Sequence, residues 1–165
     1  MRKSVIKGIR MPVLPSGYRL SQLRVFHLIR VFRIGRQCFR DGSFAYKRFL
    51  KIYYRGRHTS FVVCFKGRAV GFIVGFMRED GGYVAYLAVE PENRKKYLGR
   101  TLMEWIHQVF ADRGAQRVSL HVRTTQEATI AFYHKIGYTI EATREKFYPD
   151  EESAYVMRFK FTDHT

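Results

Sequence analysis

The fold of this chain is decided by residues 82–101, GYVAYLAVEPENRKKYLGRT, and by the segment that continues from there to residue 113. Residues 83–89 are aromatic or apolar and contain no breaker, which predicts a buried strand that stops at Pro91. Beyond the strand, apolar residues recur at helical spacing along one side: Leu98, Leu102, Trp105, Ile106, Val109 and Phe110. The stretch therefore predicts a strand, a basic loop and a helix that begins close to Gly99.

Three cationic residues, Arg94, Lys95 and Lys96, stand directly before this helix. The first turn of a helix presents unpaired backbone N–H groups and a partial positive charge, and neighbouring cations strengthen that field. The arrangement predicts a site for an anion such as a phosphate or pyrophosphate. A solvated basic turn is the alternative interpretation of the same residues.

The loop at residues 94–99, RKKYLG, resembles the Arg/Gln-x-x-Gly-x-Gly/Ala loop of the GCN5-related N-acetyltransferases (GNAT), which holds the pyrophosphate of acetyl-coenzyme A (acetyl-CoA). Two later segments, LHVR at 120–123 and AFYHKIGY at 131–138, are similar to the second half of that family. The likeness covers about residues 59–160 and, more loosely, residues 17–58. Within the family, the chain looks most like the protein N-terminal acetyltransferases.

Tyr97 departs from the family loop, because it stands where the family usually has its first glycine. If the backbone there must adopt a positive φ or stay bare, a tyrosine costs energy at this position. Acetyl-CoA affinity, and activity with it, depend on how the chain accommodates this residue.

The composition fits one globular domain of 165 residues, because 46% hydrophobic and 16% aromatic residues exclude a disordered chain. The longest apolar run, residues 69–77, is too short to span a bilayer. Cys38 and Cys64 have no metal-binding spacing, so we expect no metal site. So few cysteines fit a reducing compartment, and we expect a cytoplasmic protein.

The positive charge is concentrated in the first third of the chain. Residues 1–58 hold 15 Lys or Arg against one acid, Asp41, and the whole chain has a net charge of +16. Such a segment would attract RNA or the ribosome, an anionic membrane or an acidic protein. The alternative is that a basic surface only favours an anionic cofactor and solubility.

The pattern of elements predicts a basic N-terminal arm at 1–16 and a single GNAT domain at 17–162, with an α+β (α/β) fold. The expected order is β-α-α-β-β-β-α-β-α-β-β, a mixed, mostly antiparallel sheet of six to seven strands with helices on both faces. A strand at 17–20 should pass directly into a helix at 21–37 with Ser21 as its N-cap. The strand at 118–122 should run parallel to the strand at 83–89, because a helix connects them.

The resemblance implies attack of a free amine on the thioester of acetyl-CoA, which would be held by three segments. Backbone N–H groups at the helix start would hold the pyrophosphate, the edge of the preceding strand would polarise the thioester carbonyl, and residue 126 would contact the pantetheine arm. The implied acetyl-CoA-binding residues are Leu87, Ala88, Val89, Arg94, Lys95, Lys96, Tyr97, Leu98, Gly99, Arg100, Thr101, Gln126 and Tyr133.

Four side chains are candidate catalytic groups. The resemblance implies that Tyr133 donates a proton to the departing thiolate, and a buried core aromatic is the alternative. His121 can accept a proton from the amine, since imidazole titrates near neutrality, although a lone strand histidine is often structural. Tyr83 and Tyr86 are alternative acceptors through water, and we expect one to face the cleft and the other to pack.

For the acceptor amine, the resemblance implies a pocket formed by Phe39, Phe44, Tyr83, His121, Phe147 and Tyr148. A protein or peptide N-terminus is the favoured acceptor, and a lysine or a small-molecule amine is the alternative. The acids at 150–152 could attract a cationic amine, but a solvated acidic turn is the simpler interpretation. A function of another class also remains: an RNA- or ribosome-binding protein with a degenerate acetyltransferase half.

Overall fold

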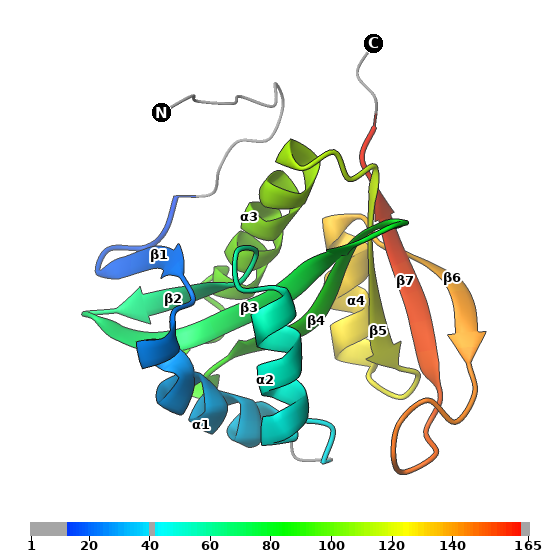
Figure 1. Cartoon of the computed structure of the whole chain (residues 1–165), viewed down its shortest axis with the longest axis horizontal. Helices are drawn as coiled ribbons and strands as arrows, with labels where there is room; N and C mark the ends of the chain where they lie inside the picture. The colour runs from blue at the N-terminus through cyan, green and yellow to red at the C-terminus, as the bar shows by residue number, and fades with distance from the viewer. Residues whose placement is uncertain (1–12, 40–41, 163–165) are drawn as a thin grey trace.

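The computed structural model describes residues 13–39 and 42–162, which form an open seven-stranded sheet with helices on both faces (Figure 1). Short 3-10 turns precede the first helix (η1, Val25–His27) and the third (η2, Pro91–Asn93). The predicted order of strands and helices is confirmed. Along the chain the elements are β1 (Tyr18–Gln22), α1 (Leu28–Cys38), α2 (Tyr46–Arg55), β2 (Phe61–Phe65), β3 (Arg68–Arg78), β4 (Gly81–Val89), α3 (Leu98–Asp112), β5 (Arg117–Arg123), α4 (Glu127–Ile136), β6 (Thr139–Arg144) and β7 (Ala154–Lys160).

The strands lie in the order β1-β2-β3-β4-β5-β7-β6, and every neighbouring pair is antiparallel except β4 and β5. The connection through α3 makes those two strands parallel, as predicted. Only two residue pairs join them, Gly82 with Val118 and Tyr83 with Ser119. Beyond Tyr83 the two strands separate, and the sheet opens toward their carboxyl ends.

Each face of the sheet is covered by one pair of helices (Figure 1). α1 and α2 pack on an aromatic cluster that includes Phe44, Phe49, Phe72 and Tyr86. α3 and α4 pack on the other face, where most of the predicted helical stripe of α3 is fully buried: Leu98, Leu102, Ile106 and Phe110. Burying one such side chain stabilises the fold by about 1.5–3 kcal/mol, so this stripe fixes α3 and the loop before it.

The first helix begins later than predicted. A helix at 21–37 with Ser21 as its N-cap is wrong, because Ser21 and Gln22 belong to β1 and pair with Val62 and Phe61 of β2. α1 starts only at Leu28, after η1. The apolar spacing around residue 23 was helical, but pairing with a distant strand decides the conformation of these residues.

The predicted N-terminal arm falls mostly on residues 1–12, which lie outside the described residues. Leu14 already packs against the core on the α3 side of the sheet. The boundary between arm and domain at residue 17 stays a prediction. None of the helices in the described ranges combines the length and the apolar content needed to cross a bilayer.

An ion pair fastens α1 to the end of β4. The Arg30 guanidinium contacts the Glu90 carboxylate, and Arg30 Nε donates to the Ala69 carbonyl at 3.1 Å. The Glu90 amide donates to the Val70 carbonyl of β3 at 2.8 Å. These bonds hold α1 beside the place where β4 leaves the sheet, which is also where the candidate site begins.

A buried histidine should make the fold sensitive to acid. His107 of α3 is 3% exposed; its Nε2 lies 2.7 Å from the Tyr138 hydroxyl, and its ring stacks on Phe159. Burial lowers the His107 pKa to about 3. Between that value and about 6.5 the unfolded chain binds a proton that the folded chain does not, so stability falls as pH falls.

We therefore expect His107 to reduce the free energy of unfolding by up to about 2 kcal/mol between pH 7 and pH 5. Urea unfolding at the two pH values measures this difference. In His107→Phe the pH dependence should be smaller, even though the variant also has a constant cost from the Tyr138 hydroxyl that loses its partner. If the pH dependence of the variant equalled that of the parent, the folded protein would protonate His107 as readily as the unfolded chain does.

Candidate active site

The separation of β4 and β5 brings together aromatic and basic side chains from several elements. The Tyr83 hydroxyl lies 3.0 Å from His121 Nδ1, across the gap between the two strands. The His121 ring stacks on Phe147 with centroids 4.3 Å apart and an angle of 5° between the planes. The Arg78 guanidinium lies 3.6 Å from the centre of the Tyr83 ring. Three predicted site residues thus meet, together with Arg78, which sequence reasoning missed.

His121 stays neutral at neutral pH. Burial, with the positive charges of Arg78 and Arg144, lowers its pKa to about 4. The expected titration near neutrality is therefore wrong, because a half-buried imidazole beside two cations disfavours a further positive charge. The neighbouring Tyr83 keeps its proton, since burial raises its pKa. At neutral pH, His121 is therefore a weak proton acceptor, and it is hydrogen-bonded to the protonated phenol of Tyr83.

Tyr83 and Tyr86 lie on the same face of the sheet, although residues three apart in a strand normally point to opposite faces. The register between β3 and β4 shifts at Ala85, which makes Ala85 the extra residue of a β-bulge. Tyr83 contacts Phe76, whose ring lies beneath Arg55 of α2, and Tyr86 packs on rings of the α1–α2 cluster, so both tyrosines lie on that face. Tyr83 contacts His121 and Tyr86 packs among aromatic rings, while the role of either as a proton acceptor stays a prediction.

Phe39 and Phe44 stand at the two ends of the connection between α1 and α2. Their rings stack with centroids 5.5 Å apart, and both contact Tyr86 edge-on. Residues 40–41 of the predicted turn lie outside the described residues. The two phenylalanines therefore adjoin Tyr86 on the face that also carries Tyr83 and His121.

The loop before α3 has a backbone suited to an anion. Lys95 and Tyr97 both have a left-handed φ of 60°, and the Thr101 amide makes the first helical bond, to the Tyr97 carbonyl at 2.9 Å. The amides of residues 98–100 precede the internal hydrogen bonds of the helix. A methyl group added at Gly99 would meet nothing closer than the Phe132 ring at 3.5 Å. The chain therefore leaves room beside the helix start.

Side-chain contacts brace this loop. Arg94 Nε donates to the Val89 carbonyl at 3.0 Å, and Lys96 Nζ donates to the Tyr18 hydroxyl at 3.1 Å. Arg100 pairs with a glutamate one turn further along α3 at 2.7 Å. Arg94, Lys96 and Arg100 are thus held around the start of α3, where their charge adds to the potential of the helix terminus.

The end of β4 turns backbone amides into the gap. The Glu90 amide bonds to β3, whereas the Val89 carbonyl accepts from the Arg94 side chain on the other side. Because residues of an antiparallel strand alternate in the direction of their polar groups, the amides of Leu87 and Val89 point away from β3. The amide of Ala88 faces β3, with which Ala88 pairs. Two of the three predicted strand residues therefore offer N–H groups to the gap.

Tyr133 lies on α4, in the layer that covers the opposite face of the sheet from Tyr83 and His121. Its side chain is 8% exposed, and its ring lies 5.6 Å from that of Tyr138. Burial, and then the phenols of Tyr148 and Tyr83, raise its pKa well above that of a free tyrosine. Tyr133 belongs to the core on the α3–α4 side of the sheet, and its ring contacts are Phe132 and Tyr138. Gln126 is the N-cap residue of α4.

The loop between β6 and β7 is held by Arg123, a second residue that sequence reasoning missed. Arg123 is buried, pairs with Asp150 at 2.8 Å and with Glu152 at 2.5 Å, and its guanidinium lies 3.9 Å from the Tyr148 ring. These contacts fix the loop that places Phe147 on His121. The spacing of two residues from His121 could have indicated Arg123, because alternate residues of β5 share one face.

The acids of this loop are engaged within the protein. Hydrogen bonds from Arg123 lower the pKa of Asp150, and hydrogen bonds from Thr125 and Arg123 lower that of Glu152. Glu151 pairs with Lys146 at 3.7 Å on the surface. The idea that these acids attract a cationic amine is therefore not supported. The simpler interpretation as a surface turn fits, with the addition that Arg123 anchors the turn to β5.

Comparison with known proteins identifies the family. Residues 28–138, more than half of the chain, match the acetyltransferase (GNAT) family. The chain belongs to the GNAT family. The predicted family and fold are thereby confirmed. Membership of this acetyltransferase family implies N-acetyl transfer from acetyl-CoA, as the resemblance of the sequence predicts.

Two relatives and one solved structure illustrate the likeness. The N-alpha-acetyltransferase daf-31 of Caenorhabditis elegans is 33% identical over 100 residues, which cover 56% of this chain and 55% of that protein, so the chain spans about half its length. The ribosomal protein bS18-alanine N-acetyltransferase of Escherichia coli K12 is 28% identical over 104 residues, covering 61% and 70%. The crystal structure of Ard1 from Thermoplasma volcanium has the same fold, with a TM-score of 0.82 and 23% identity over 89% of this chain and 99% of that chain.

Replacing Tyr97 by glycine tests the departure from the family loop. Tyr97 is 77% exposed, and its left-handed φ costs a non-glycine residue about 1–2 kcal/mol. Because glycine loses more conformational entropy on folding, we expect Tyr97→Gly to raise the free energy of unfolding by about 1 kcal/mol or less. The affinity for coenzyme A should stay equal or rise. Urea unfolding and isothermal titration with coenzyme A measure the two quantities.

Tyr97→Ala is the matched control, because it removes the ring but keeps the Cβ atom that makes the left-handed conformation costly. It should gain no stability. If Tyr97→Gly and Tyr97→Ala both lost coenzyme binding, the tyrosine ring itself would be a contact of the coenzyme, and the backbone account of the loop would be wrong.

Proposed function

We propose that this protein transfers the acetyl group of acetyl-CoA to the N-terminal amine of a protein or peptide. The observation that carries the proposal is the gap between β4 and β5. The Tyr83–His121 pair borders it on the α1–α2 face of the sheet, and Tyr133 of α4 is buried in the layer that covers the other face. A thioester on one side and an amine on the other could therefore meet within a single opening.

Acetyl-CoA would supply an acetyl group activated as a thioester. The start of α3 fits its pyrophosphate, because unbonded amides, left-handed residues and cations converge there. The amides of Leu87 and Val89 would donate hydrogen bonds to the thioester oxygen, where negative charge grows during attack. Gln126, at the head of α4, is the proposed contact of the pantetheine arm.

Three side chains would manage the protons. Tyr133 would donate to the departing thiolate, since burial keeps its phenol protonated. Tyr83 and His121 would receive the proton of the attacking amine. A histidine whose pKa lies at about 4 holds a proton only briefly, so the pair would relay it to solvent. The rise of turnover with pH should then report the ionisation of the acceptor amine.

This weak base favours an N-terminal amine over a lysine. An α-amino group has a pKa of about 7.7–8.0 and is partly neutral at physiological pH, whereas a lysine at about 10.4 is almost wholly charged. The neutral His121 cannot easily deprotonate the second kind. Phe147, Tyr86 and the Phe39–Phe44 pair add an aromatic wall for the first residues of a peptide. The names of the two relatives above describe an N-alpha-acetyltransferase and an acetyltransferase that acts on an alanine of ribosomal protein bS18.

A paired peptide assay tests the acceptor. Each peptide carries a free N-terminus and an internal lysine, and its control has the same sequence with a blocked N-terminus. Mass spectrometry should find acetylation at the N-terminus of the first peptide and little change in the second. Equal acetylation of both peptides would establish lysine as the acceptor. Acetylation of a small free amine and of neither peptide would establish the small-molecule alternative.

A thermal shift separates the enzyme from the alternative of another class. Acetyl-CoA at about 100 times its Kd should stabilise the folded protein by about 2.7 kcal/mol. A binding protein with a degenerate acetyltransferase half should show no shift at millimolar acetyl-CoA, and that result would overturn the proposal.

We also propose a cytoplasmic location, because the chain has only two cysteines, and Cys64 is a half-buried residue of β2.

A further inference from the structure

The outer surface of α1 and α2 carries a hollow that none of the proposed catalytic residues lines. Its volume is about 390 Å³, within the range of small-ligand sites. Its wall is apolar and partly aromatic, and two guanidinium groups stand at its edge. The lining residues are Leu28, Ile29, Phe32, Arg33, Arg36 and Tyr46.

The aromatic part of this hollow is rigid and accessible. The rings of Phe32 and Tyr46 meet edge-to-face with centroids 4.9 Å apart, and Phe32 also contacts the buried Phe44. Tyr46 is 51% exposed and Ile29 is 74% exposed. Flat apolar groups beside exposed arginines suit a ligand that combines a planar ring with an anionic group.

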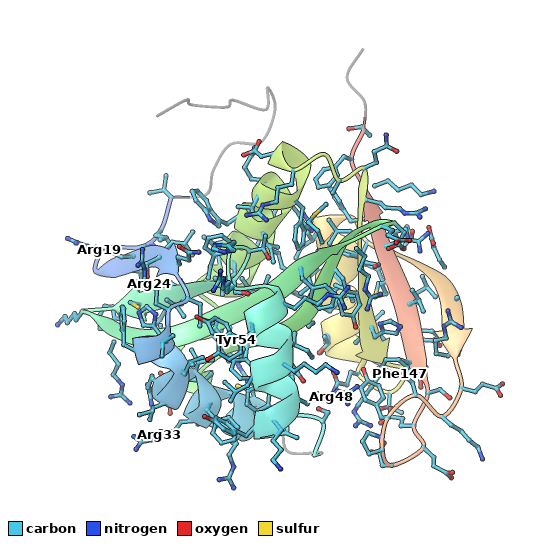
Figure 2. The ribbon with its side chains drawn as sticks, in the orientation of Figure 1. Arg19, Arg24, Arg33, Arg48, Tyr54 and Phe147 are labelled. Carbon is cyan, nitrogen blue, oxygen red and sulfur yellow. The ribbon has the colours of Figure 1, made fainter. Side chains whose placement is uncertain are left out.

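The surface around the hollow is positively charged. α1 and α2 together contain seven Lys or Arg and no acid. Figure 2 shows Arg19, Arg24 and Arg33 on the side of the molecule formed by β1, α1 and α2, with Tyr54 on α2. Phe26 is 76% exposed and Tyr54 is 57% exposed, so apolar rings alternate with cations over this face.

We propose that this face, formed by β1, α1 and α2, binds single-stranded RNA, with one base in the hollow against Phe32 and Tyr46. Phosphates would lie on Arg33 and Arg36, since guanidinium groups bind phosphate through paired hydrogen bonds. Stacking platforms within a cationic groove are the usual means of holding single strands. Only an unpaired base can enter such a hollow, which favours a single strand over a duplex. The proposal does not depend on acetyl transfer.

The pattern of the face favours RNA over a protein partner. The centre of a protein–protein interface is usually depleted of charged residues, whereas here α1 and α2 carry seven Lys or Arg beside the exposed Tyr46 and Tyr54. An acidic protein or an anionic membrane could meet the charge, but neither would need the hollow. Variants of the ring therefore separate nucleobase stacking from attraction of charge alone.

Fluorescence anisotropy with a short, unstructured, labelled RNA tests the proposal in the full-length protein. Affinity should fall as salt rises from about 50 to 200 mM, and Arg33→Gln should lower the slope of log K against log salt by about 0.7. Lys135→Gln is the matched control: it removes one charge from an exposed residue of α4, on the opposite face of the sheet. It should leave affinity and slope unchanged.

The ring is tested by Tyr46→Ala, which should weaken RNA binding about 5- to 150-fold, while Tyr46→Phe should retain it. Both variants should keep the melting temperature, because Tyr46 is half exposed at the start of α2. Four outcomes would overturn the proposal: no RNA binding at the lowest salt, equal effects of Arg33→Gln and Lys135→Gln, no effect of Tyr46→Ala, or equal binding of an acidic peptide or of phosphatidylserine vesicles.

Discussion

Tyr133→Phe should lower turnover by about 10²–10⁴-fold, because it removes the hydroxyl proposed to donate a proton to the departing thiolate. The phenylalanine ring fills the same buried position, so the affinity for coenzyme A and the melting temperature should change little. Because burial raises the pKa of Tyr133, the parent enzyme should also lose no activity through this residue as pH rises toward 10. Steady-state assays between pH 6 and 10 with the best acceptor peptide measure both effects.

Tyr138→Phe is the matched control. Tyr138 is a neighbouring buried tyrosine, 1% exposed, whose hydroxyl bonds to His107 rather than reaching the gap. Its loss should cost stability of about 1 kcal/mol and leave turnover per folded molecule nearly unchanged. If Tyr133→Phe were as active as the parent, Tyr133 would be a core residue, and the thiolate would take its proton from water.

Gly99→Glu should abolish binding of acetyl-CoA without unfolding the protein. The carboxylate would stand among the amides at the start of α3 and repel the pyrophosphate. An acid in the first turn of a helix is favourable by about 0.3–1 kcal/mol, and the nearest group to a new Cβ is the Phe132 ring at 3.5 Å. Titration calorimetry with acetyl-CoA and urea unfolding should therefore give opposite results: lost binding and unchanged or greater stability.

Gly99→Ala separates charge from bulk at the same position. It adds the methyl group alone and should keep most of the affinity, since the chain leaves room beside residue 99. Retained acetyl-CoA binding in Gly99→Glu would place the pyrophosphate elsewhere, and the proposed role of the α3 amides would have to be abandoned.

Much of the fold could be predicted, because the helices and strands have their own apolar periodicity and end at residues that terminate regular structure. The stripe on α3 and the order of elements depend on neighbours in sequence. The β1–α1 boundary could not be predicted, because Ser21 pairs with Val62, about forty positions away, and no local pattern records that pairing.

The site was predicted as residues but not as an arrangement. His121, Tyr83 and Phe147 were all chosen from the sequence, yet their stacking and hydrogen bonding depend on the bulge at Ala85 and on a loop anchored by Arg123. The depressed pKa of His121 depends first on burial and then on Arg78 and Arg144, which come from two other strands. Electrostatic effects of this kind arise from tertiary neighbours and leave no signature in the order of residues.

The short pairing between β4 and β5 has a consequence for how the protein opens. Only Gly82 and Tyr83 of β4 pair with β5. The sheet therefore consists of two smaller ladders of paired strands, β1–β4 and β5-β7-β6, which are joined by two residue pairs. A coenzyme lying between β4 and β5 would take the place of the strand pairing that is absent there. Amide hydrogen exchange in the two ladders should then differ in the free protein and become slower and more uniform when the coenzyme is bound, so that acetyl-CoA makes one cooperative unit out of two.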